Sequence, residues 1–295
     1  MEAEFLCANV FYPLMDEQKT TKGDQYIDVK QVFYKKNPRL AKILPGFVFT
    51  FIKRIIHQDE MNEAMAKYGH FQGLEFINKA LDYLGLHVKT LGLENIPGDG
   101  RYIFVANHPL GGLDGIAFAN EVGKKFPDIR FIVNDILMNI KNFDPIFIPV
   151  NKHGRQSVDY VRKIEETYES DVQILNFPAG LCSRKINGRI VDLEWHKSFI
   201  TKAIRHKRRV VPVHINGRNS NFFYNLAKIR SFLGIKANIE MFFLPDEMFK
   251  QKNKDLIIRF GEPIPYQTFD SSKKPSEWAR WVKEKVYSMG EEITK

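Results

Sequence analysis

The chain has little cysteine: its 295 residues include only Cys7 and Cys182. Two isolated cysteines exclude a disulfide-stapled scaffold and a cysteine-rich zinc site, and they fit a reducing compartment. The eight histidines show no metal-ligand spacing with one another or with cysteine, so no metal ion and no bound cofactor are expected.

Long apolar runs are also absent. The longest nearly uncharged stretch, ILPGFVFTFI (43–52), is about half of the roughly 20 residues that a membrane-spanning helix needs. The N-terminus, MEAEFLCANVFYPLMDEQ, carries acidic residues where a signal peptide has basic ones. Any membrane contact is therefore expected to be interfacial, at a bilayer surface.

Acidic residues are missing from one region of the chain. Residues 29–57 contain seven Lys or Arg and no Asp or Glu, are rich in Phe and Ile, and are divided by Pro38 and Pro45. A basic, apolar segment too short to span is typical of helices lying on an anionic membrane surface. A helical arm packed on the main domain with a solvated basic face is an equal alternative. The net charge of +9 favours anionic partners in general.

After residue 86 the chain alternates β-rich runs with runs of helical period. We expect strands at 87–93, 101–107, 129–134, 145–150, 172–177, 209–215, 238–245 and 255–265. We expect helices at 59–85, 115–125, 156–169, 198–207 and 275–293. This alternation predicts an α/β fold with a mixed, mostly parallel sheet flanked by helices. Residues 1–86 are assigned to an N-terminal helical, basic, interfacial segment, and residues 87–295 to one further domain.

The stretch VANHPLGGLDGIAF leads from an apolar strand into a loop that holds a histidine and an aspartate. On one continuous helix His108 and Asp114 would point about 120° apart, but the proline and two glycines between them favour a folded loop. Such a loop can bring the Asp114 carboxylate to one ring nitrogen of His108 and leave the other free as a general base. Asp114 is also expected to cap the following helix. The alternative is a surface histidine and an aspartate that only caps.

Two further apolar runs lead into similar turns, FPAGLCSR at 177–184 and VPV at 211–213. The three blocks, in this order, resemble those of the glycerolipid acyltransferase family, the lysophosphatidic acid acyltransferase-like enzymes, over roughly residues 87–265. The form N-H-P-x-G-x-x-D with F-P-A-G-x-x-S-R is more similar to a bacterial hemolysin-like subgroup. That subgroup includes the O-acyltransferases that complete ornithine and glycine lipids.

The resemblance implies that residues 87–295 form an acyltransferase domain. The donor would be a fatty acyl thioester of acyl-carrier protein or coenzyme A, and the acceptor the hydroxyl of a membrane lyso-lipid. The protein would then be peripheral, on the cytoplasmic face of the inner membrane. His108 would act as the general base and Asp114 would orient it. The backbone N–H groups of Gly111, Gly112 and Gly180 could donate to the oxyanion. With these three glycines, the residues expected to bind substrate are Asn107, Gly111, Gly112, Phe177, Pro178, Gly180, Ser183, Arg184, Lys185 and Arg189.

The chain departs from the family pattern in the part that holds the acceptor. The histidine–aspartate spacing is one residue longer, Ala179 stands in place of Glu, and Leu181-Cys182 stand in place of Thr-Arg. For the arginine of the second block, the nearest cations are Lys152 and Arg155. In the family, that glutamate and arginine help to hold a glycerol-phosphate head group.

These departures favour a lyso-amino-acid lipid as the acceptor and leave lysophosphatidic acid as the runner-up. Arg184, Lys185 and Arg189 could bind a zwitterionic or carboxylate head group, because a guanidinium donates two parallel hydrogen bonds to a planar anion. A solvated turn is the alternative for these three cations.

Two other functional classes compete with the acyltransferase. The basic run RHKRR (205–209) suggests nucleic-acid binding, but no helix-turn-helix, zinc-finger or RNP-like pattern accompanies it, so no nucleic-acid partner is expected. A membrane-binding or lytic protein without catalysis is the second alternative, although a compact α/β domain is a poor pore former.

Overall fold

A computed structural model describes residues 26–36, 38–134, 140–150, 158–236 and 238–291. Within these ranges, seven strands form one mixed sheet in the order β1-β9-β8-β2-β5-β3-β4, and only the β8–β9 pair is antiparallel. The strands of this sheet are β1 (His87–Leu91), β2 (Tyr102–Ala106), β3 (Ile129–Asn134), β4 (Phe147–Val150), β5 (Gln173–Asn176), β8 (Arg209–Asn216) and β9 (Asp255–Phe260). A separate antiparallel hairpin consists of β6 (Arg184–Ile186) and β7 (Arg189–Val191).

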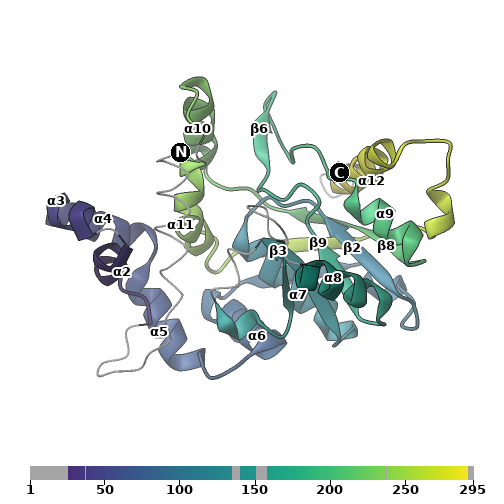
Figure 1. Ribbon diagram of the computed structural model, residues 1–295, viewed down its shortest axis with the longest axis horizontal. Coiled ribbons are helices and arrows are strands. Elements are labelled where there is room, and N and C mark those ends of the chain that lie inside the picture. The colour runs from purple at the N-terminus through teal and green to yellow at the C-terminus, as the bar shows by residue number, and fades with distance from the viewer. Residues whose placement is uncertain (1–25, 37, 135–139, 151–157, 237, 292–295) are drawn as a thin grey trace.

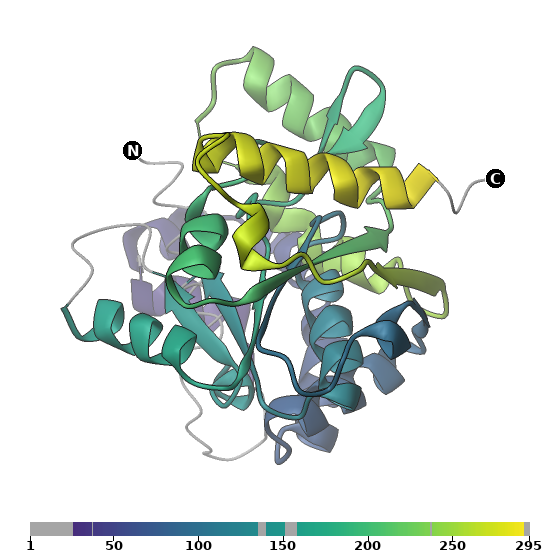
Figure 2. The same ribbon diagram turned by 90° about the vertical axis from the view of Figure 1, so that its right-hand side faces the viewer.

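Helices cover both faces of the sheet (Figures 1 and 2). The helices are α2 (Val29–Lys36), α3 (Pro38–Ile43), α4 (Gly46–Ile55), α5 (Gln58–Tyr68), α6 (Gly73–Leu84), α7 (Gly112–Lys125), α8 (Val158–Glu169), α9 (Ser198–Arg205), α10 (Asn221–Phe232), α11 (Leu244–Phe249) and α12 (Pro275–Glu291). Short 3₁₀ turns are η2 (Leu93–Asn95), η4 (Lys141–Phe143), η5 (Ile239–Phe243) and η6 (Tyr266–Thr268).

The central strand β2 is buried on both faces, because neighbouring side chains of a strand point to opposite sides. Phe104 packs into a cluster with α6 and α7, whereas Ile103 and Val105 pack into a second cluster with α9 and α12. The predicted α/β class and mostly parallel sheet are confirmed. The packing of α6 into the first cluster joins the last part of the predicted N-terminal segment to the sheet, and the proposed boundary at residue 87 stays a prediction.

Three expected elements differ from the structure. The helix expected at 59–85 divides into α5 and α6, because the Gly69 N–H closes α5 on the Met65 carbonyl and Gly73 has a φ of +60°. The strand expected at 238–245 is instead η5 followed by the start of α11. Glu240 in η5 is fully buried and forms ion pairs with Arg184 and Arg230, contacts that local β propensity does not contain. The sequence analysis predicted neither the hairpin β6–β7 nor helix α10.

The basic helices α2–α4 form a small cluster of their own that includes Phe33, Phe49 and Ile52. His57, which follows α4 with a φ of +52°, joins this part to α11: its Nε2 lies 3.1 Å from Asp246 Oδ1 and its ring stacks on Phe249. No helix in the described part of the chain is both long and apolar enough to cross a membrane.

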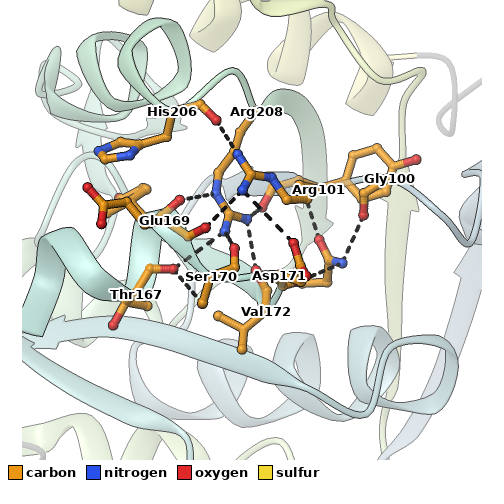
Figure 3. Close-up of polar contacts among 12 residues, drawn as sticks. Gly100, Arg101, Thr167, Glu169, Ser170, Asp171, Val172, His206 and Arg208 are labelled. Atoms are coloured by element: carbon orange, nitrogen blue, oxygen red, sulfur yellow. Dashed lines mark hydrogen bonds and ion pairs between the residues drawn. The ribbon is translucent and has the colours of Figure 1, made fainter.

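Two of the five residues in the basic run at 205–209, His206 and Arg208, are buried and hydrogen-bonded inside the protein (Figure 3), whereas Arg205, Lys207 and Arg209 are exposed. Arg208 is fully buried and donates hydrogen bonds to the carbonyls of Thr167 and Tyr168 in the last turn of α8 and to those of Ser170 and Val172 just after it. Burial lowers the pKa of this guanidinium to about 10. His206 is also buried, with Nε2 3.0 Å from a carboxylate oxygen of α8. The buried part of the run therefore binds the C-terminal end of α8, and the run does not present five exposed cations.

Candidate active site

Three chain segments meet beside the central strand because β5 and β8 are the two neighbours of β2. Val105 pairs with Asn176 of β5, and Ala106 pairs with Val213 of β8. The three strands are parallel, so the loops that follow them begin at the same edge of the sheet. This topology brings together the three sequence blocks that are separated by up to about a hundred residues in the chain.

The predicted contact between His108 and Asp114 is confirmed. His108 Nδ1 lies 2.9 Å from Asp114 Oδ1, and the other carboxylate oxygen accepts the N–H of Leu110 at 2.7 Å. Asp114 is fully buried, whereas the His108 side chain is 17% exposed. Within the described residues no protein group hydrogen-bonds to Nε2 of His108. A buried carboxylate that receives Nδ1–H fixes the tautomer in which Nε2 carries the lone pair.

The loop between these residues reaches its shape through Gly111. Its φ of +83° is a conformation that other residues rarely adopt, and an added Cβ would lie 2.9 Å from Leu244 and 3.1 Å from the Cys182 sulfur. Helix α7 starts at Gly112 with Gly111 at its N-cap, so the expectation that Asp114 caps this helix is wrong. The Asp114 carboxylate lies in the first turn and is directed to His108 and the Leu110 N–H instead.

The imidazole of His108 rests on an aromatic side chain from the second block. Phe177 stacks on it with ring centroids 4.0 Å apart and an interplanar angle of 19°. Phe177 in turn contacts Phe118 and Phe131 of the sheet's first core cluster. The stacking places one face of the histidine against apolar carbon and so restricts how the ring can turn.

Asp192 is a central residue of the site that the sequence analysis missed. Its buried carboxylate accepts the His108 backbone N–H at 3.2 Å, the Ser183 hydroxyl at 2.5 Å and the Trp195 indole N–H at 2.8 Å. The Ser183 N–H also donates to the His108 carbonyl at 2.7 Å. The hairpin β6–β7 folds the eight residues between Ser183 and Asp192 back on themselves. A lone Asp after a hairpin that was not predicted gave no local signal.

Other predicted substrate-binding residues are committed to the protein itself. The Asn107 amide donates to the Ile215 carbonyl and accepts the Ile215 N–H, which ties the loop after β2 to β8. The Gly180 N–H, one expected oxyanion donor, bonds the Phe177 carbonyl within its own turn, and the Pro178 carbonyl accepts a backbone N–H from residue 196. Gly111 and Gly112 stand at the start of α7, where the first N–H groups have no partner inside the helix.

The three cations after the second block occupy different positions. Arg184 is buried, donating to the Cys182 carbonyl and pairing at 2.9 Å with Glu240. Lys185 and Arg189 lie exposed on the hairpin β6–β7. The structure therefore uses Arg184 as an internal tie and leaves the other two at the surface.

The remaining expectations concern groups near the site. Cys182 is fully buried, and burial raises the pKa of its thiol well above the ordinary range, which leaves it protonated and unreactive. Lys152, Arg155 and Cys7 lie outside the described residues. Two cavities lined by described residues have volumes of about 520 Å³, beside α2–α4, and about 850 Å³, between residues 207–209 and 265–268. Neither is lined by His108 or Asp114, and the acyl channel expected beside these residues stays a prediction. Among the described residues no cluster of His, Cys, Asp or Glu could hold a metal ion.

The chain is similar to a family model, to two named relatives and to a solved structure. A family model described as Acyltransferase matches residues 31–294. The chain is 47% identical over 264 residues to a lyso-glycine lipid O-acyltransferase of Bacteroides thetaiotaomicron, which covers 89% of this chain and 97% of the relative. It is 46% identical to a protein of the same name from Phocaeicola vulgatus, covering 89% and 95%. A solved 1-acyl-sn-glycerophosphate acyltransferase, PlsC, from Thermotoga maritima is similar at 18% identity and a TM-score of 0.46, over 83% of this chain and 89% of that one.

Proposed function

Because the chain belongs to the acyltransferase family and is an acyltransferase, we propose that it acylates the hydroxyl of a lyso-amino-acid lipid. Two relatives at 46–47% identity carry the name lyso-glycine lipid O-acyltransferase, which supports lyso-glycine lipid as the acceptor. Ala179 in place of the family's glutamate supports an acceptor without a glycerol-phosphate head. Lysophosphatidic acid is the competing acceptor.

The observation that carries the mechanism is the His108–Asp114 pair. In the proposed step, Nε2 of His108 removes the acceptor's hydroxyl proton while the oxygen attacks the carbonyl carbon of an acyl thioester. The tetrahedral intermediate collapses with cleavage of the C–S bond, and the imidazolium returns the proton to the departing thiolate. Asp114 holds the Nδ1–H and stabilises the positive charge that develops on the ring.

The oxyanion of that intermediate requires donors that are already in place. The start of α7 lies next to the dyad, and its unpaired N–H groups, including that of Gly112, carry the positive end of the helix dipole. Asp192 and Ser183 fix the backbone of His108 and the turn after β5 relative to each other. The proposed catalytic geometry is thus held by contacts from three separate chain segments.

The test is acyl transfer with purified full-length protein. Synthetic lyso-glycine lipid and lysophosphatidic acid are offered separately, each with acyl-coenzyme A and with acyl-acyl-carrier protein, and products are identified by mass spectrometry. Doubly acylated glycine lipid is expected, and the His108→Ala variant should lose it by about 10²-fold or more. Product from lysophosphatidic acid alone would overturn the acceptor, and an active His108→Ala would overturn the mechanism.

We further propose that α3 and α4 hold the enzyme on an anionic bilayer at the cytoplasmic face. Ile43, Phe47 and Phe51 are 77%, 73% and 59% exposed at four-residue spacing, beside the exposed Lys42 and Arg54. Replacing Phe47 and Phe51 with serine should reduce sedimentation with vesicles that contain phosphatidylglycerol. Undiminished sedimentation would refute this role.

A further inference from the structure

Helix α10 exposes an apolar stripe that the proposed function does not use. Phe222, Ile229, Phe232 and Leu233 are 51%, 56%, 90% and 62% exposed. At 3.6 residues per turn these four positions fall on one side of the helix. The opposite side, with Phe223, Tyr224 and Ala227, is buried against the protein. The helix therefore presents apolar side chains to solvent along its whole length.

The helix is held firmly, so the outward stripe is part of the fold. Its N-cap, Ser220, accepts the Phe223 N–H and donates its hydroxyl to the buried Glu247 at 2.6 Å. Near its other end, the Arg230 Nε lies 2.9 Å from the buried Glu240, which also pairs with Arg184 of β6. A carboxylate between two guanidiniums fixes α10 to η5 and to the hairpin, because breaking a buried pair leaves a charge without a partner.

The stripe is also fixed relative to the N-terminal helices. In η5, Phe243 makes an edge contact with Phe222 of α10 at 4.9 Å, and the neighbouring Phe242 packs on the cluster of α2–α4. Figure 1 shows α10 and β6 rising side by side above the sheet, with α2–α4 on the same left-hand part of the molecule. Segment η5 thus contacts both α10 and the cluster of α2–α4.

The charge around the stripe indicates its occupant. Residues 221–236 contain no acidic residue and expose Lys228 and Lys236, while Arg230 is paired with Glu240. The adjoining hairpin at 184–191 also has no acidic residue and exposes Lys185 and Arg189. Protruding aromatic and aliphatic side chains with exposed cations beside them are the features of a helix that lies in the interface of an anionic bilayer.

We propose that α10 is a second membrane-contacting helix, which inserts Phe232 and Leu233 into the head-group region of an anionic bilayer. With α3 and α4 it forms one contact face joined through η5. The inference extends the proposed function, since a lipid acceptor could pass from the bilayer to the loops after β2 and β5 without crossing water. The hairpin β6–β7, which packs beside α10 and leads to Asp192, connects this face to the dyad.

Vesicle sedimentation of the full-length protein tests the proposal. The vesicles contain equal parts of phosphatidylcholine and phosphatidylglycerol, and the double variant Phe232→Ser/Leu233→Ser is compared with Val161→Ser/Ile204→Ser, which alters similarly apolar exposed residues on α8 and α9. The α10 variant should bind about 10- to 100-fold more weakly, because each large apolar side chain is worth roughly a factor of ten in partitioning. The control should bind as the parent does.

A fluorescence measurement locates the helix directly. A Phe232→Trp variant should show a blue-shifted emission with these vesicles and quenching by brominated lipid, whereas Ile204→Trp should show neither. Equal vesicle binding by parent and α10 variant, or unchanged emission from Phe232→Trp, would overturn the proposal. If the α10 variant instead loses only its affinity for acyl-carrier protein, the stripe is a protein-docking surface and the proposal is wrong.

Failure of the proposed membrane contact by α10 can be distinguished from failure of the proposed acyltransferase function. The His108→Ala variant should sediment with vesicles as the parent does, because its substitution lies outside the contact face. If no acceptor lipid is acylated by the parent protein, the proposed function fails, while the comparison of α10 with its control still decides whether the helix contacts a membrane.

Discussion

Replacing Asp114 with asparagine tests the proposed chemistry with almost no change in shape. The carboxylate accepts two hydrogen bonds, one from each side, and an amide can accept on one side only. If the amide oxygen faces His108, the amide N–H₂ opposes the Leu110 N–H, and buried donors without partners cost about 1–3 kcal/mol. If the oxygen faces Leu110, the amide donates to Nδ1 of His108 and both bonds survive.

The second arrangement is therefore favoured in the folded variant, and it has a chemical consequence. A ring that accepts at Nδ1 carries its hydrogen on Nε2, so the nitrogen that should remove the substrate proton has no lone pair for it. We expect turnover to fall by about 10²–10⁴-fold, equivalent to roughly 3–5 kcal/mol of activation free energy. The free energy of unfolding should change by no more than about 1 kcal/mol.

The assay pairs acyl-transfer kinetics with denaturant unfolding. A matched control is Glu121→Gln, which alters another buried carboxylate of α7 that accepts the Thr90 hydroxyl at 2.7 Å, away from the dyad. The control should retain its turnover number. An Asp114→Asn protein that folds normally and turns over like the parent would refute the assignment of His108 as the base.

Three further predictions follow from the structure. Gly111→Ala should lower the free energy of unfolding by about 1–3 kcal/mol because of its positive φ and crowded Cβ, whereas Gly112→Ala, with nothing within 4 Å, should be nearly neutral in thermal denaturation. Burial lowers the pKa of His214 to about 4, so the unfolded chain takes up this proton first as the pH falls. The parent should then lose about 1 kcal/mol between pH 7 and pH 5.5 through this group, a loss absent in His214→Gln and present in the exposed His87→Gln. Asp192→Asn should both destabilise the protein by about 1–3 kcal/mol and reduce turnover, and full turnover would show that its three hydrogen bonds do not position the site.

Much of the fold could be predicted because its signals are local. Six of the expected strands correspond to β1–β5 and β8, and the run at 255–265 begins with β9. The Pro-Gly-Gly loop after β2 also predicted the His108–Asp114 contact, since both partners lie within seven residues of each other. The strand expected at 238–245 failed because Glu240 is held by an ion pair with Arg184, 56 residues earlier in the chain, and this contact outweighs local propensity.

The sequence by itself determined the alternation of strands and helices, the order of the three blocks and the His108–Asp114 pair, because periodicity and turn chemistry act over a few residues. Only the tertiary structure decided that Asp192 holds the backbone of His108, that Arg184 is an internal tie, and that α10 leaves an apolar side uncovered. Those outcomes depend on which strands become neighbours and on which faces are covered after the chain has folded. Interactions between residues that are distant in the sequence decide the strand neighbours and the covered faces, and a short stretch of sequence does not contain these interactions.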